Sequence, residues 1–78
     1  MERHKVGERV LWVTYVNSPG YYKPGEKIPG EVIDVFFDPP IYRIRLDICW
    51  DERVSDKSLH GKKIIVGNVM HEHILPTT

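Results

Sequence analysis

The 78-residue sequence contains no alanine and no glutamine, and it has a single cysteine, Cys49. Alanine is the strongest helix former, so its absence disfavours a helical fold. One cysteine excludes an intramolecular disulfide and fits a reducing compartment. No apolar run approaches the roughly 20 residues that span a bilayer, and the start of the chain does not resemble a signal peptide. We therefore expect a cytoplasmic protein without a membrane partner.

Charge of one sign is not in excess, because eleven Lys and Arg residues balance eleven Asp and Glu residues. General nucleic-acid coat proteins need positive charge to neutralise phosphates, so zero net charge argues against that class. The 41% of hydrophobic residues exclude a disordered chain. A chain of this length forms one domain around one modest core. The sequence therefore predicts a single domain over residues 1–78.

Six glycines and six prolines punctuate the chain, a pattern typical of short strands and turns. Apolar and polar residues alternate over 41–50, which predicts a half-buried antiparallel strand. Further strands are expected over 6–16, 28–38 and 62–66, with a helical turn and a short closing strand over 69–76. Apolar residues occupy both parities of 28–38, which indicates either a β-bulge or two covered faces. The predicted core comprises Val10, Trp12, Val32, Ile44, Leu46, Ile48 and Trp50.

Short motifs resemble those of the SH3-like barrel superfold. Gly-Glu-Arg-Val opens the first expected strand at 7–10, Pro-Gly-Glu-Val opens the second at 29–32, and a turn of the Glu-His-Ile-Leu-Pro type at 72–76 precedes closure of the barrel. The resemblance implies an all-β fold, a small five-stranded SH3-like barrel with a short helical turn before the last strand. Closure of such a barrel leaves no sheet edge exposed. A superfold carries no function with it, so function has to be argued from sites.

The loop after the first expected strand holds two tyrosines between two Pro-Gly corners. Tyrosine rings offer flat contact area at low entropic cost. In SH3-like barrels the first loop commonly lines the ligand groove. We therefore predict a non-catalytic binding module or accessory subunit with a protein or peptide partner, and the alternative is that one ring is a lid on the core. The predicted ligand-binding residues are Tyr15, Tyr21, Tyr22 and Lys23.

A second candidate surface is basic and comprises Arg43, Arg45, Lys62 and Lys63. If the third and fourth strands pair, these side chains form a stripe suited to nucleic-acid phosphates. The simpler alternative is cross-strand ion pairing, because three aspartates lie in the same region: Asp34, Asp38 and Asp47.

The first two expected strands leave apolar side chains on their outer faces: Leu11, Val13, Ile33 and Val35. A contiguous apolar patch on a small protein is typical of an interface. We therefore predict a homo-oligomer, most simply a two-fold dimer. The competing interpretation is that a bulge turns the additional apolar side chains of the second strand toward the core.

Three stretches, Val-Gly-Glu-Arg-Val at 6–10, Pro-Gly-Glu-Val at 29–32 and Tyr-Arg-Ile at 42–44, are similar in order and spacing to those of type II dihydrofolate reductases. Members of that family are homotetrameric SH3-like barrels with a shared pore. The active surface of that family depends on a Val-Gln-Ile-Tyr stretch, whereas residues 64–68 here are Ile-Ile-Val-Gly-Asn. An enzyme site built at subunit interfaces is therefore only a second alternative, and no catalytic residue is predicted.

Two further constellations are weighed and set aside, so no cofactor or metal is predicted. In a helical turn His71 and His73 are expected to diverge, which favours solvated or capping roles over zinc binding. An aromatic cage of the Tudor type would need its rings at the surface, and we favour core packing for them. The rings concerned are Trp12, Tyr15, Tyr42 and Trp50.

Overall fold

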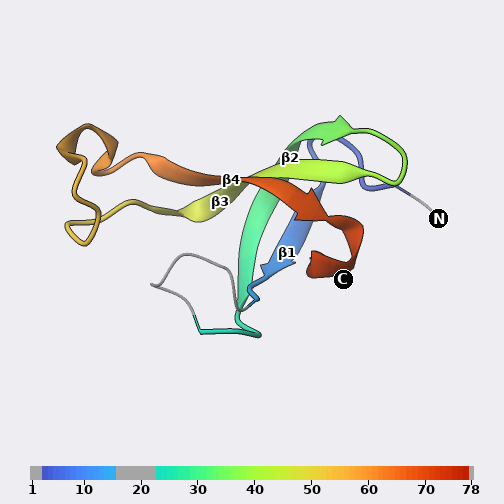
Figure 1. Ribbon diagram of the computed structural model, residues 1–78, viewed down its shortest axis with the longest axis horizontal. Coiled ribbons are helices and arrows are strands. Elements are labelled where there is room, and N and C mark those ends of the chain that lie inside the picture. Colours follow the sequence, from blue (N-terminus) through green and yellow to red (C-terminus); the bar gives the residue numbers. More distant parts are fainter. Residues whose placement is uncertain (1–2, 16–22, 78) are drawn as a thin grey trace.

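The structure, a computed structural model, describes residues 3–15 and 23–77. Its architecture is all-β, as predicted, with five antiparallel strands in the order β4-β3-β2-β1-β5 (Figure 1). The strands are β1 (Arg9–Val13), β2 (Lys27–Phe36), β3 (Ile41–Cys49), β4 (Lys63–Met70) and β5 (Ile74–Pro76). The helical elements of the described ranges are two 3-10 turns, η1 (Lys57–Leu59) and η2 (His71–His73). The predicted helical turn before the last strand is therefore confirmed as η2.

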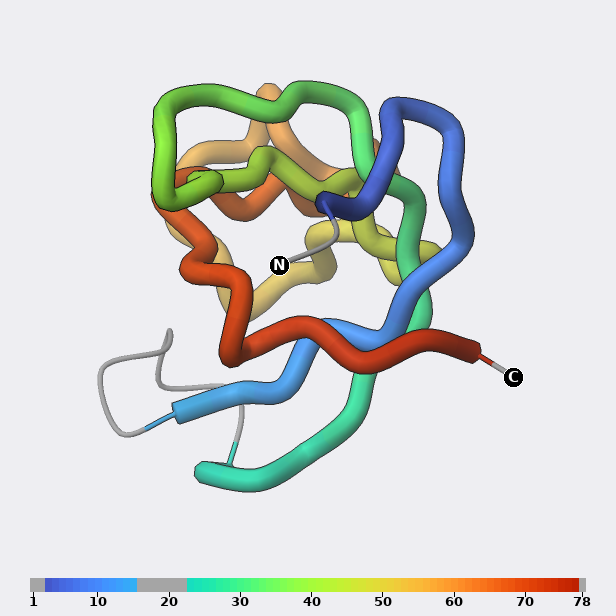
Figure 2. Tube along the Cα trace, turned by 90° about the vertical axis from the view of Figure 1, so that its right-hand side faces the viewer, coloured from blue at the N-terminus to red at the C-terminus, as the bar shows by residue number. Residues whose placement is uncertain are grey.

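The long strand β2 joins the two halves of a coiled sheet. Its first half pairs with β1 and its second half with β3, and Gly30 lies in register with both Val10 and Leu46. On the other side of β1 lies β5, which brings the end of the chain back across the sheet (Figure 2). β4 and β5 form the two edges, and the described strands make no ladder between them. The described part of the chain is thus a coiled sheet with two edges.

A β-bulge interrupts β2, which is one of the two alternatives that the sequence offers. Between Val32 and Asp34 the register against β3 shifts, so Ile33 is an extra residue without a partner in the ladder. Beyond the bulge, Val35 packs against the core. The bulge therefore explains why apolar residues occupy both parities of this strand.

β4 is longer than the sequence predicts. Gly67 and Asn68 do not end it at Val66, because the register against β3 shifts there and the strand continues to Met70. Asn68 has a φ of 55° in this irregularity, a left-handed conformation that asparagine adopts more readily than most residues. None of the helical elements in the described ranges has the length and apolar character of a membrane span.

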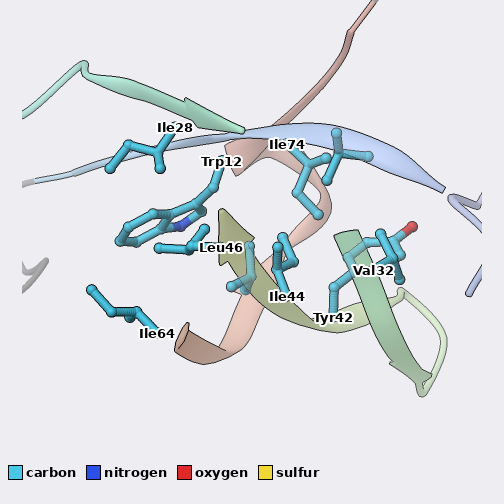
Figure 3. Close-up of a cluster of buried hydrophobic side chains, with 10 residues drawn as sticks. Trp12, Ile28, Val32, Tyr42, Ile44, Leu46, Ile64 and Ile74 are labelled. Atoms are coloured by element: carbon cyan, nitrogen blue, oxygen red, sulfur yellow. The ribbon is translucent and has the colours of Figure 1, made fainter. Parts of the chain in front are cut away.

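The core is one cluster of buried side chains to which all five strands contribute (Figure 3). The cluster comprises Val10, Trp12, Ile28, Val32, Tyr42, Ile44, Leu46, Ile64, Val69 and Ile74. Trp50 packs against it while half-buried. The prediction for Ile48 is wrong, because this side chain is 36% exposed. Ile48 lies where the register between β3 and β4 shifts, between Arg45 and Cys49, so alternation does not hold its side chain against the cluster. From here the β3–β4 hairpin extends from the body as an arm (Figure 1).

Candidate functional site

The loop between β1 and β2 leaves the sheet from a hydrogen-bonded base. Thr14 is 2% exposed, and its hydroxyl donates to the carbonyl oxygen of Lys23 at 2.5 Å and accepts from the N–H of Glu26 at 2.9 Å. The N–H of Gly25 donates to the carbonyl oxygen of Thr14 at 2.8 Å, and Gly25 has a φ of 88°. A buried hydroxyl with a donor and an acceptor partner fixes the backbone on both sides. The two ends of the loop are therefore held together by Thr14.

Tyr15 and His73 form an aromatic pair beside this base. Their ring centroids are 4.4 Å apart, the planes are tilted by 35°, and both residues are half-buried. The pairing of β1 with β5 brings them together, because Trp12 lies opposite Ile74 and the chain after Trp12 therefore runs beside η2. The pair presents a phenol and an imidazole, which can stack on a ligand and also hydrogen-bond to it. Sequence reasoning missed His73, since only strand pairing places it next to Tyr15.

The predicted ligand-binding residues fall into two groups. Tyr15 and Lys23 flank the base of the loop, where Lys23 is exposed. Tyr21 and Tyr22 lie outside the described residues. The described part of the predicted site is therefore its base, with His73 as an addition.

The arginines of the predicted basic surface are paired with carboxylates on the neighbouring strand. Arg43 lies 3.2 Å from a carboxylate oxygen of Asp34, and Arg45 lies 3.3 Å from one of Glu31. Each pair is in register across β2 and β3. The guanidinium of Arg43 also lies over the ring of Phe36, 5.7 Å from its centroid. The simpler alternative, cross-strand ion pairing, therefore describes both arginines.

The two lysines of that surface lie farther along the arm. Lys62 is exposed just before β4, and Lys63 lies opposite Cys49 at its first position. Asp47 bonds to Arg9, and this bond lowers the pKa of the Asp47 carboxyl, to which Lys63 adds a weaker attraction. Lys63 therefore also has a carboxylate nearby.

The four residues of the predicted oligomer interface do not share one outer face. Leu11 and Val13 lie half-buried on β1, Ile33 is the bulge residue, and Val35 packs against the core. This arrangement corresponds to the competing interpretation, in which the bulge turns some of the additional apolar side chains of β2 toward the core. The homo-oligomer itself stays a prediction.

A cluster that sequence reasoning missed joins the N-terminal segment to the end of the sheet. His4 bonds through Nδ1 to the carboxylate of Glu8, and its backbone N–H donates to the hydroxyl oxygen of Tyr42 at 3.1 Å. Nδ1 of His71 lies 2.9 Å from the same hydroxyl, and the rings of His4 and His71 stack with centroids 5.1 Å apart. The bond to His4 lowers the pKa of the Glu8 carboxyl. We call these four residues the histidine cluster.

The histidine cluster and the aromatic pair use the two ends of η2. His71 contacts Tyr42 and His4, whereas His73 contacts Tyr15, so the two imidazoles diverge. Both are half-buried rather than solvated. The only advance signal for the cluster is the spacing of His4 and Glu8 near the start of the chain, which says nothing about Tyr42 or His71.

Metal-ligating side chains do not converge in the described ranges: no three His, Cys, Asp or Glu residues there are placed to hold an ion. The chain matches no protein-family model, no curated protein and no solved structure. Function therefore has to be inferred from the geometry of the loop base, the aromatic pair and the histidine cluster.

Proposed function

We propose that the chain is a small non-catalytic binding module that contacts a protein or peptide at the base of the β1–β2 loop. The observation that carries this proposal is the Tyr15–His73 pair, whose ring centroids lie 4.4 Å apart beside the loop base that Thr14 holds together. Rigid aromatic groups lose little conformational entropy on binding. A fixed loop base lowers the entropic cost further.

The topology supports an SH3-like barrel as the scaffold. β5 lies beside β1, β2 is shared between the two halves of the sheet, and a 3-10 turn precedes β5. In SH3-like barrels the first loop commonly lines the ligand groove. On this proposal Tyr21 and Tyr22 also contact the ligand, and Lys23 supplies a cation at the edge of the site.

The test is an NMR titration of ¹⁵N-labelled protein with three probes: a proline-rich peptide, a trimethyl-lysine peptide and a single-stranded oligonucleotide. We expect one of the peptides to shift the amide signals of Tyr15, Lys23 and His73. The Tyr15→Ala variant should weaken that binding about tenfold, a change typical of losing one aromatic contact. Phe37→Ala is the matched control, because Phe37 is an exposed aromatic residue in the β2–β3 turn and should not affect binding.

Two outcomes would contradict the proposal. In the first, neither peptide shifts the three signals at millimolar concentration. In the second, only the oligonucleotide binds, with shifts on β3 and an affinity that falls steeply with salt, as expected for phosphate neutralisation. Binding to aromatic groups depends much less on ionic strength.

A further inference from the structure

The N-terminal segment over residues 3–8 crosses the end of the coiled sheet (Figure 2). At its C-terminal side the segment belongs to the sheet, because Gly7 N–H donates to Val32 O at 2.8 Å and Val32 N–H donates to Glu8 O at 3.0 Å. Its first residues are held differently. Arg3 pairs with the exposed Asp38 at 3.4 Å, and His4 is held by the histidine cluster.

The hydrogen-bond inventory of Tyr42 defines the protonation state of His71. The Tyr42 side chain is fully buried, and its oxygen accepts from the N–H of His4. A phenol has one proton to donate, and the acceptor for it among the described residues is Nδ1 of His71. Nδ1 can accept only while it carries no proton. The closed arrangement therefore requires a neutral His71 with its hydrogen on Nε2.

We propose that the histidine cluster is an acid-sensitive latch, in which protonation of His71 releases residues 3–5 from the end of the sheet. Imidazole is the side chain that ordinarily changes its charge between about pH 5 and 8, so this is the range over which the proposal is tested. A proton from solvent on Nδ1 removes the acceptor of the Tyr42 hydroxyl and leaves a buried donor without a partner. The proposal is independent of the binding function and holds whatever the ligand is.

Repulsion between the two histidines strengthens this response. The carboxylate of Glu8 accepts from His4 Nδ1, and an imidazole with a proton on Nδ1 makes this bond in its neutral and in its cationic form. His71 has no carboxylate among its hydrogen-bond partners in the described chain, and its ring stacks on His4. Two imidazolium rings 5.1 Å apart would repel each other. His4 is therefore the anchor of the latch, and His71 carries the acceptor on which the closed arrangement depends.

The remaining charges around the two imidazoles come from three places. The N-terminal segment contributes Arg3, Lys5 and Glu8 near His4. The turn η2 contributes Glu72 and His73 near His71, and the β2–β3 turn contributes Asp38, the partner of Arg3. Glu72 follows His71 directly, but it is exposed, and its carboxylate lies 4.0 Å from Nε2 of His73.

The amide hydrogen of His4 reports the state of the latch directly, because it donates to Tyr42. Hydrogen exchange followed by NMR, corrected for the intrinsic rate, should show its protection falling about tenfold or more between about pH 7.5 and about pH 5.5. The Gly7 amide is an internal reference, because it bonds to Val32 and should keep its protection.

Three variants separate the latch from a general acid effect. In His71→Gln the side-chain carbonyl can accept from Tyr42 and does not titrate, so His4 should stay protected at the lower pH. Tyr42→Phe keeps the buried ring and removes the hydroxyl, so His4 should be unprotected at both pH values. His60→Gln is the matched control: His60 is exposed and bonds to the carbonyl oxygen of Val54, so this variant should behave as the parent chain does.

The proposal is overturned if protection of the His4 amide does not change with pH in the parent chain. It is equally overturned if protection falls as much in His71→Gln as in the parent, which would place the titration elsewhere. If His71→Gln does not fold, the folded Tyr42→Phe variant still decides: unchanged, pH-dependent protection of His4 in that variant would rule out the latch.

Discussion

Gly30 of β2 lies so close to β3 that a Cβ atom added to it would come within 2.8 Å of the carbonyl oxygen of Arg45. The same atom would lie 2.9 Å from Cγ2 of Ile44. Both distances are shorter than ordinary van der Waals contact, and the oxygen belongs to backbone that cannot rotate away. The close approach occurs where β2 pairs with both β1 and β3. The coiling of the sheet therefore depends on the absence of a side chain at this position.

Replacing Gly30 with alanine should lower the free energy of unfolding by about 1–3 kcal/mol, the usual cost of an overpacked core. Urea denaturation of the purified protein measures this directly. Gly67→Ala is the matched control, because nothing lies within 4 Å of its added Cβ. It should change stability by less than about 0.5 kcal/mol. Equal losses in the two variants would show that strand propensity, rather than the contact with β3, sets the effect.

Leu46 and Ile48 share one parity of β3 but differ in burial. Leu46 is fully buried, whereas Ile48 is 36% exposed where the hairpin leaves the body. Truncation of Leu46 to alanine should cost about 2–4 kcal/mol. The same truncation at Ile48 should cost less than about 1 kcal/mol, since part of its surface is already in water. Comparable losses on urea denaturation would place Ile48 in the core after all.

The sequence predicts the strands well where local pattern and burial agree. Alternation over 41–50 corresponds to β3, whose alternate residues Tyr42, Ile44 and Leu46 are fully buried. The same pattern fails at Ile48, because the register between β3 and β4 shifts between Arg45 and Cys49 and interrupts the alternation there. Burial at Ile48 depends on how β4 pairs with β3, which the local pattern of β3 does not contain.

The candidate site is less predictable because its contacts join distant parts of the chain. The Tyr15–His73 pair needs β1 to lie beside β5, and the histidine cluster joins residues that are 38 and 29 positions apart. Neither pairing leaves a local signal. By contrast, the ion pair of Arg43 with Asp34 follows from hairpin register, which is why the sequence suggests it as the simpler alternative.

The predicted dimer can be tested by mass. Leu11 lies in register with Leu75 on one side and Pro29 on the other, and Leu75 is 37% exposed. We expect sedimentation at tens of micromolar to give twice the 9.1 kDa of one chain. The double variant Leu11→Lys, Val13→Lys should sediment as a monomer, because charges at an apolar contact are costly to bury. A parent chain that sediments as a single copy would contradict the dimer. An unchanged mass in the double variant would show that Leu11 and Val13 do not lie in the interface.

Thr14 should contribute to stability through its hydroxyl rather than its bulk. Thr14→Val keeps the shape but removes the hydroxyl that accepts from the Glu26 N–H and donates to the Lys23 carbonyl oxygen. Between those two backbone groups only a bond of 3.3 Å then remains. We expect a loss of about 1–3 kcal/mol and faster hydrogen exchange at Glu26. Thr77→Val is the control, because Thr77 is exposed and its hydroxyl makes one long bond of 3.5 Å to Arg9. A Thr14→Val variant as stable as the parent would mean that the base of the loop does not depend on this hydroxyl.

Asp47 should make the protein less stable in acid. Its bond to Arg9 lowers the pKa of the carboxyl below the ordinary 3.8, so the ionised form is favoured in the folded state. The resulting stabilisation is present above the ordinary value and is lost as pH falls through the lowered pKa. Hydrogen bonds lower the pKa values of the Asp51 and Asp56 carboxyls in the same direction.

The expected result is a melting temperature that declines below about pH 4, with a flatter decline in Asp47→Asn, where no carboxyl remains to be protonated. The difference should be small and should shrink in high salt, because both partners are partly exposed and screened. Glu52→Gln is the control, since Glu52 is an exposed carboxylate of the same arm and should leave the decline unchanged. If Asp47→Asn declines as steeply as the parent, the bond between Asp47 and Arg9 does not contribute to acid unfolding.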